Sequence, residues 1–119
     1  MEIKLKRFHG IYIIFIEGEL DLYNAPKLET AFTTLVDKGV DSLILDLGRI
    51  SYIDSSGIGL LLKLNSKAKK EQLGFVLSGV GGEVLHVLQL TNLIDFFPRA
   101  KTYREGLESL LNHKKAANG

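Results

Sequence analysis

The sequence predicts an α/β fold, in which a single domain is built on a sheet that includes parallel strands. Apolar, β-branched segments alternate along the chain with segments whose apolar residues recur at helical spacing, a pattern typical of parallel strands joined by helical crossovers. The 119 residues fit one hydrophobic core. Hydrophobic residues make up 45% of the chain and charged residues 24%, as in ordinary globular domains. The sequence has no internal repeat or linker, so one domain accounts for it.

The first third of the chain predicts two strands and a helix. Residues 2–8 alternate apolar with charged side chains, which predicts a half-exposed strand. After a turn, residues 11–16 form an apolar, β-branched run that predicts a more buried strand. Asn24 is expected to cap a helix whose early Pro26 suits the first turn. That helix carries one apolar stripe and ends at Gly39.

The middle of the chain continues the alternation. Residues 43–47 predict a short buried strand and residues 56–70 a second helix. Residues 74–77 predict a third buried strand, and residues 82–90 a helix with an apolar face. A short extended piece is expected at residues 94–96.

The last predicted element is a helix that begins at a capping box. Thr102 and Glu105 have the spacing at which a threonine hydroxyl and a glutamate carboxylate satisfy the first free N–H groups of a helix. Residues 114–119 have no large apolar side chains to bury in a core, so we expect a frayed tail there. The domain is therefore assigned to residues 1–113.

Composition excludes several classes of function. The chain has no cysteine, which rules out disulfides and thiolate metal sites. Its three histidines, His9, His86 and His113, lack ligand spacing, so we expect no metal and no cofactor. The charged amino terminus does not resemble a signal peptide, and no apolar stretch approaches the roughly 18 residues that a membrane span needs. We therefore expect a cytoplasmic protein that binds no membrane. A net charge of +1 also argues against direct binding to nucleic acid.

The most informative segment is Asp54-Ser55-Ser56-Gly57-Ile58-Gly59, which opens the longest predicted helix. Asp54 or Ser55 is expected at the N-cap, where a side-chain oxygen accepts a free backbone N–H. Gly57 and Gly59 then fall in the first turns, where each costs up to about 1 kcal/mol relative to alanine. Two interpretations stay open. The segment is an ordinary cap with glycines packed on the sheet, or the glycines let a partner approach the backbone closely.

A serine at this position also suits a phosphorylation switch. A phosphate carries about −1.5 to −2 charges, and the dipole and free N–H groups of a helix amino terminus favour it. The helix need not unfold. Instead, a surface that already bears Asp54 becomes larger and strongly anionic, so phosphorylation would control binding rather than folding.

Two motifs together resemble the anti-sigma-factor antagonists of the STAS domain family. Gly18-Glu19-Leu20-Asp21 followed by Asn24-Ala25-Pro26 is similar to one family segment, and residues 53–59 are similar to the family's phosphorylation motif. Weaker similarity extends the resemblance over nearly the whole chain. It implies a mixed central sheet of four to five strands with helices mainly on one face.

The resemblance also implies a mechanism. The unphosphorylated protein would bind an anti-sigma factor with serine kinase activity and so free a sigma factor. That kinase would phosphorylate Ser55 and end the binding, and a serine phosphatase would restore it. ATP and its metal would belong to the kinase, not to this chain. The implied partner-binding residues are Asp21, Asn24, Asp54, Ser56, Gly57, Ile58 and Gly59. We expect Gly57 to face the partner, whereas for Gly59 inward packing and partner contact are equally open.

Two other functions are considered. A STAS module that regulates a transporter or a larger signalling assembly would keep the fold with a different partner. An enzyme with Ser55 as nucleophile would need a base, commonly histidine, but the sequence has no G-x-S-x-G elbow and no motif places a histidine. We therefore predict that the chain is not an enzyme. The glycine-rich residues 78–83 lack the Lys-Ser/Thr of a phosphate-binding P-loop, and a role in binding is left open there.

Overall fold

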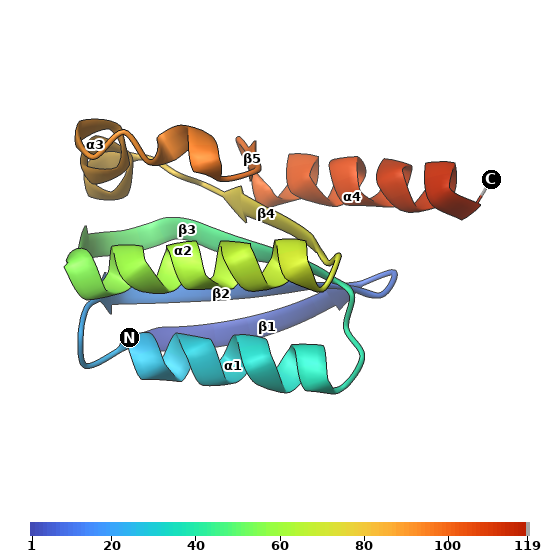
Figure 1. The fold of residues 1–119 in the computed structure, drawn as a ribbon, viewed down its shortest axis with the longest axis horizontal. Coiled ribbons are helices and arrows are strands. Elements are labelled where there is room, and N and C mark those ends of the chain that lie inside the picture. Colours follow the sequence, from blue (N-terminus) through green and yellow to red (C-terminus); the bar gives the residue numbers. More distant parts are fainter. Residues whose placement is uncertain (119) are drawn as a thin grey trace.

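The computed structural model describes residues 1–118 and confirms the α/β fold with a mixed sheet. Five strands lie in the order β1-β2-β3-β4-β5 (Figure 1). β1 pairs antiparallel with β2, and the other neighbouring pairs are parallel. The strands are β1 (Glu2–Phe8), β2 (Ile11–Leu20), β3 (Ser42–Ile53), β4 (Gly74–Ser78) and β5 (Arg99–Ala100).

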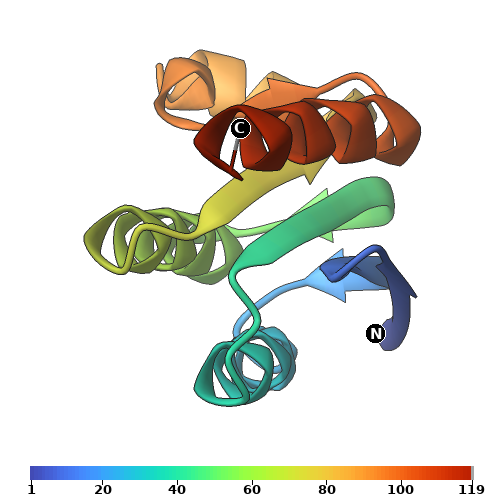
Figure 2. The ribbon, with the colours of Figure 1, turned by 90° about the vertical axis from the view of Figure 1, so that its right-hand side faces the viewer.

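The α-helices cover the two faces of the sheet unequally, as the resemblance implies. α1, α2 and α3 pack on one face and form the larger hydrophobic core, whereas α4 packs on the other face over a smaller cluster. In Figure 2, α1 and α2 lie together on one side of the strands. The helices are α1 (Ala25–Asp37), α2 (Ser55–Lys70), α3 (Gly82–Leu90) and α4 (Tyr103–Asn118), with a single 3₁₀ turn, η1 (Ile94–Phe96), before β5.

Alternation along β3 divides its side chains between the two cores. Leu43, Leu45 and Leu47 enter the larger core, and Ile44 enters the smaller one, because successive side chains of a strand point to opposite faces. In the larger core, Phe32 of α1 is fully buried and meets Phe75 of β4 edge to face, with ring centres 5.6 Å apart. The central strands are thus buried on both sides, as their apolar sequences predict.

β2 and β3 are longer than the sequence predicts. They continue to Leu20 and Ile53, which are partners at the carboxyl ends of the two strands. Two register shifts interrupt the pairing on the way, between Phe15 and Glu17 and again after Gly18. The extra length places the two sequence motifs side by side.

Two further predictions need correction. Residues 94–96 form a 3₁₀ turn rather than an extended piece, because the Phe96 carbonyl accepts a hydrogen bond from Asn65 Nδ2 at 2.9 Å and the buried Phe97 anchors the chain directly after it. α4 also does not fray at residue 114 but continues to Asn118. Lys114 supports this extension through an ion pair with Asp41 at 3.1 Å. The remaining residue of the predicted tail, Gly119, lies outside the described residues.

Within residues 1–118, no helix is both long enough and apolar enough to cross a membrane.

Candidate functional site

The two sequence motifs meet at the carboxyl ends of β2 and β3. The first motif continues from β2 into the loop before α1, and the second continues from β3 directly into α2. The backbone N–H of Asp54 donates to the carbonyl oxygen of Leu20 at 3.3 Å, which joins the two strand ends. The sheet therefore brings together segments that are about thirty residues apart in the chain.

Asp54 is the N-cap of α2 and also holds the neighbouring loop. Its Oδ1 accepts from the N–H of Gly57 at 3.1 Å, the bond expected of a helix cap. Its Oδ2 accepts from the N–H of Leu22 at 3.3 Å. Of the two cap candidates that the sequence offers, the structure selects Asp54. Both oxygens of this carboxylate are engaged with the backbone.

Asp21 shapes the loop between β2 and α1. Its Oδ1 accepts from the N–H groups of Tyr23 at 3.1 Å and Asn24 at 2.9 Å, an arrangement in which an aspartate side chain organises a tight turn. Asn24 occupies the N-cap position of α1, but its side chain does not cap the helix. Instead, Asn24 Nδ2 donates to the carbonyl oxygen of Glu19 at 3.0 Å. The predicted cap is thus wrong, because the side chain of Asn24 turns back to the end of β2.

The two serines of the motif differ in accessibility. Ser55 is the first residue of α2 and is exposed, whereas Ser56 is half-buried. Ile58 is also half-buried and packs against the larger core. Ser55 is therefore the more accessible hydroxyl of the pair.

The two glycines of the motif face in different directions, and the structure contradicts the expectation for Gly57. Gly57 is buried, and a Cβ atom there would overlap the Leu20 carbonyl oxygen and lie 2.8 Å from Ile53 Cγ1. Our expectation that Gly57 faces a partner is therefore wrong, because its missing side chain lets α2 approach the end of β2. Gly59 is exposed, and a Cβ atom there would meet no heavy atom within 4 Å.

Sequence reasoning missed two exposed apolar residues beside Ser55. Leu22 and Tyr23, at the tip of the loop that Asp21 and Asp54 hold, are 63% and 85% exposed. A signal was present, since two large apolar residues stand between Asp21 and Asn24, both of which are turn formers. Adjacent large apolar residues in such a turn have no strand or helix face on which to be buried.

Among the residues that the structure describes, no group of three or more His, Asp or Glu side chains is placed to hold a metal ion. What the site presents is an exposed hydroxyl at a helix amino terminus, next to a rigidly held apolar loop.

Comparison with known proteins agrees with this arrangement. The family model of the STAS domain matches residues 2–106. An anti-sigma-B factor antagonist of Listeria monocytogenes is 33% identical over 82 residues, which cover 69% of this chain and 72% of that protein.

Solved structures share the fold. A crystal structure of an anti-sigma factor antagonist from Mycobacterium paratuberculosis is 27% identical, covers 91% of this chain and 92% of that one, and superposes with a TM-score of 0.81. The Bacillus cell fate determinant SpoIIAA in its phosphorylated form is 22% identical over 92% of this chain and 99% of that one, with a TM-score of 0.70, a likeness that supports the fold alone. Because the family model spans most of the chain, and the sheet and helices match, the chain belongs to the STAS domain family.

Proposed function

We propose that the protein is an anti-sigma factor antagonist whose binding is switched off by phosphorylation of Ser55. Relatives over most of the chain carry that name. The observation that supports the proposal best is the placement of Ser55. Its exposed hydroxyl stands at the amino terminus of α2, beside the exposed Leu22 and Tyr23.

The apolar loop supplies the kind of contact that binds a protein partner. Large aromatic side chains dominate the binding energy of many interfaces, and an anchor held in place before binding loses less conformational entropy. Asp21 and Asp54 hold the backbone around Leu22 and Tyr23 through the bonds described above. Asp21, Asn24, Ser56, Ile58 and Gly59 surround these two anchors and belong to the same proposed surface. Gly57 contributes indirectly, by letting α2 lie close to β2.

Phosphorylation would change this surface without unfolding it. The first N–H groups of α2 and the positive end of its dipole favour a phosphate on Ser55. The carboxylates of Asp21 and Asp54 lie on the same surface, so the new charge makes it strongly anionic. A partner that packs over Ser55 would have to bury an unpaired phosphate, which costs several kcal/mol. SpoIIAA, which shares the fold, is known in a phosphorylated form.

The proposed partner supplies the chemistry. We assign the kinase activity, ATP and its metal to the anti-sigma factor, and the reset to a separate serine phosphatase. This chain acts as a binding module, not an enzyme. Both oxygens of Asp54, the carboxylate next to Ser55 in sequence, accept backbone N–H bonds, which gives this residue a structural role at the helix cap. The proposed role requires a location in the cytoplasm, where sigma factors act.

Site-specific phosphorylation tests the proposal. The protein is incubated with its cognate anti-sigma kinase and Mg-ATP, and the modification is followed by intact mass and peptide mapping. We expect one added phosphate, located on Ser55. The Ser55→Ala variant should gain none, and the matched control Ser56→Ala should gain nearly as much as the wild type. Phosphate on Ser56 would show that the acceptor is misassigned, and phosphate on neither serine would remove the switch.

A further inference from the structure

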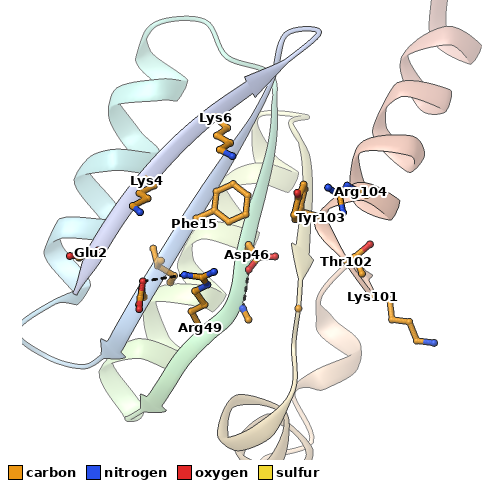
Figure 3. Close-up of a pocket in the computed structure, with 14 residues that line it drawn as sticks. Glu2, Lys4, Lys6, Phe15, Asp46, Arg49, Lys101, Thr102, Tyr103 and Arg104 are labelled. Atoms are coloured by element: carbon orange, nitrogen blue, oxygen red, sulfur yellow. Dashed lines mark hydrogen bonds and ion pairs between the residues drawn. The ribbon is translucent and has the colours of Figure 1, made fainter.

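A second site candidate lies on the opposite face of the sheet from α1 and α2. There, a cavity of about 740 Å³ opens between β1, the middle of β2 and of β3, and the amino terminus of α4. Figure 3 shows Lys4 and Lys6 of β1 on one side and Tyr103 and Arg104 of α4 on the other, with Arg49 between them. The volume is in the range of small-molecule sites, about 300–1,000 Å³.

The lining of this cavity has an excess of positive charge. Five of its side chains are basic and three are acidic. Glu17 pairs with Arg49 at 3.7 Å, so these two charges offset each other, and Asp46 keeps its charge while it accepts from Ser78 Oγ at 2.7 Å. Four basic and two acidic side chains remain, a net excess of two positive charges. Like charges that converge on one concave surface repel one another, so the lining favours an anionic occupant.

Aromatic rings hold two of the cations in place. Lys6 Nζ lies 5.9 Å from the centre of the Phe15 ring, and Arg104 Cζ lies 5.2 Å from the centre of the Tyr103 ring. The two rings meet edge to face, with centres 5.1 Å apart. Cation–π contacts of this kind restrain the charged ends of long side chains. One cation from β1 and one from α4 therefore each lie against a ring of the same aromatic pair.

The glycine-rich segment after β4 helps to form the floor. A Cβ atom at Gly79 would lie 2.9 Å from the backbone nitrogen of Gly48, so only glycine allows the two backbones to approach this closely. Both glycines line the cavity. The N–H of Gly79 donates to the carbonyl oxygen of Lys101, and the N–H of Gly48 donates to Asp46 Oδ1. Recognition of a ligand is therefore left to the side chains.

From this geometry we propose that the cavity binds a small oxyanion with two or more negative charges, either a phosphoryl compound or a polycarboxylate. Guanidinium groups bind phosphate and carboxylate oxygens in the same bidentate manner, and ammonium groups add charge without requiring a particular geometry. The site is separate from Ser55 and does not depend on the partner proposed above.

Titration at constant ionic strength tests the proposal. The full-length protein is titrated with pyrophosphate and, separately, with citrate. The heat of binding is measured by calorimetry, and the chemical shifts of the backbone amides are followed by NMR. We expect saturable binding by at least one of them, with a Kd of about 1 mM or below and with shifts concentrated at Gly48, Arg49, Gly79 and Thr102. The responding compound identifies the class of oxyanion. Absence of saturation with both, or shifts centred on α2, would overturn the proposal.

Charge-matched variants separate the cavity from general surface charge. Lys4→Gln with Lys6→Gln removes two cavity cations, and Lys69→Gln with Lys70→Gln removes two exposed lysines at the far end of α2. The first pair should weaken binding by at least about tenfold, because each removes a charged hydrogen-bond donor, and the second pair should change it little. Equal losses in both pairs would overturn the proposal. Lys4 and Lys6 both lie on β1, an edge strand, so a variant on another element is needed to separate loss of charge from disturbed strand pairing. Arg104→Gln on α4 serves this purpose and should also weaken binding.

Discussion

Replacement of Gly57 by alanine should destabilise the fold, even though alanine is the better helix former. The added methyl group would overlap the carbonyl oxygen of Leu20 and would lie 2.8 Å from Ile53 Cγ1 and 3.0 Å from Leu20 Cγ. Favourable contacts between carbon atoms lie at about 3.5–4.0 Å. The oxygen belongs to the backbone and accepts the N–H of Asp54, so it cannot rotate away as a side chain could.

The expected loss follows from two opposing effects. Overpacking a close-packed site costs typically about 1–3 kcal/mol. The gain in helix propensity from glycine to alanine is up to about 1 kcal/mol. Because the overlapped atom is a backbone oxygen that cannot move aside, the cost lies in the upper part of its range, and offset by the full propensity gain it leaves a net loss of about 1–2 kcal/mol in the free energy of unfolding. In a domain of this size, such a loss lowers Tm by roughly 3–10 °C.

Urea denaturation followed by circular dichroism measures this loss, with Gly59→Ala as the matched control. Gly59 lies in the same helix, and a methyl group there would meet no heavy atom within 4 Å. Its variant should be as stable as the wild type or more stable by up to about 1 kcal/mol. A Gly57→Ala variant that unfolds at the same urea concentration as the wild type would refute the close approach of α2 to β2.

Three further outcomes are expected. Asp54→Ala should lose about 0.5–2 kcal/mol of stability, because it removes the helix cap, and should speed hydrogen exchange at the Leu22 amide, because it removes the bond to the loop. Unchanged exchange at Leu22 would contradict the role of Asp54 Oδ2. Phe32→Ala should lower the free energy of unfolding by about 3–5 kcal/mol in denaturant titrations, whereas Phe96→Ala, at a side chain 55% exposed, should lower it far less. Similar losses in the two variants would contradict the position of the core. Ser55→Asp should leave the far-ultraviolet circular dichroism spectrum nearly unchanged and shift Tm by only a few degrees, because the added charge lies at the amino terminus of α2, the end of the helix dipole that favours it. A large loss of helix would indicate order–disorder switching instead.

The sequence predicts the elements of the fold well where burial controls the pattern. The apolar runs of β2, β3 and β4 and the stripes of the helices report directly on which faces enter a core. The far half of β3 is missed because Gly48, Arg49 and Ser51 read as a connection. In the structure this half pairs with β2 across a sheet face that α4 leaves partly open, so Arg49 and Ser51 are exposed, whereas Ile50 and Ile53 are buried in the larger core.

The sequence predicts the position of the site, but not the direction in which its residues face. The cap role of Asp54 follows from cap chemistry, which depends on residues close in sequence, whereas the choice of Ser55 rests on the resemblance to the family's phosphorylation motif. Whether Gly57 or Gly59 faces outward depends on where α2 lies relative to the end of β2, and that is a tertiary relation. The exposure of Leu22 and Tyr23 is partly tertiary in origin, because the N–H of Leu22 donates to Asp54, 32 residues away, whereas the N–H of Tyr23 donates to the nearby Asp21.

The affinity of the anti-sigma partner for the two forms of this protein tests the proposed function most directly. Unmodified protein and protein phosphorylated stoichiometrically on Ser55 are titrated against the partner by calorimetry, with Ser56→Ala treated in the same way as a control. We predict that phosphorylation weakens binding by roughly a hundredfold or more, since the interface would have to bury an unpaired phosphate. Equal affinity of the two forms would contradict the account.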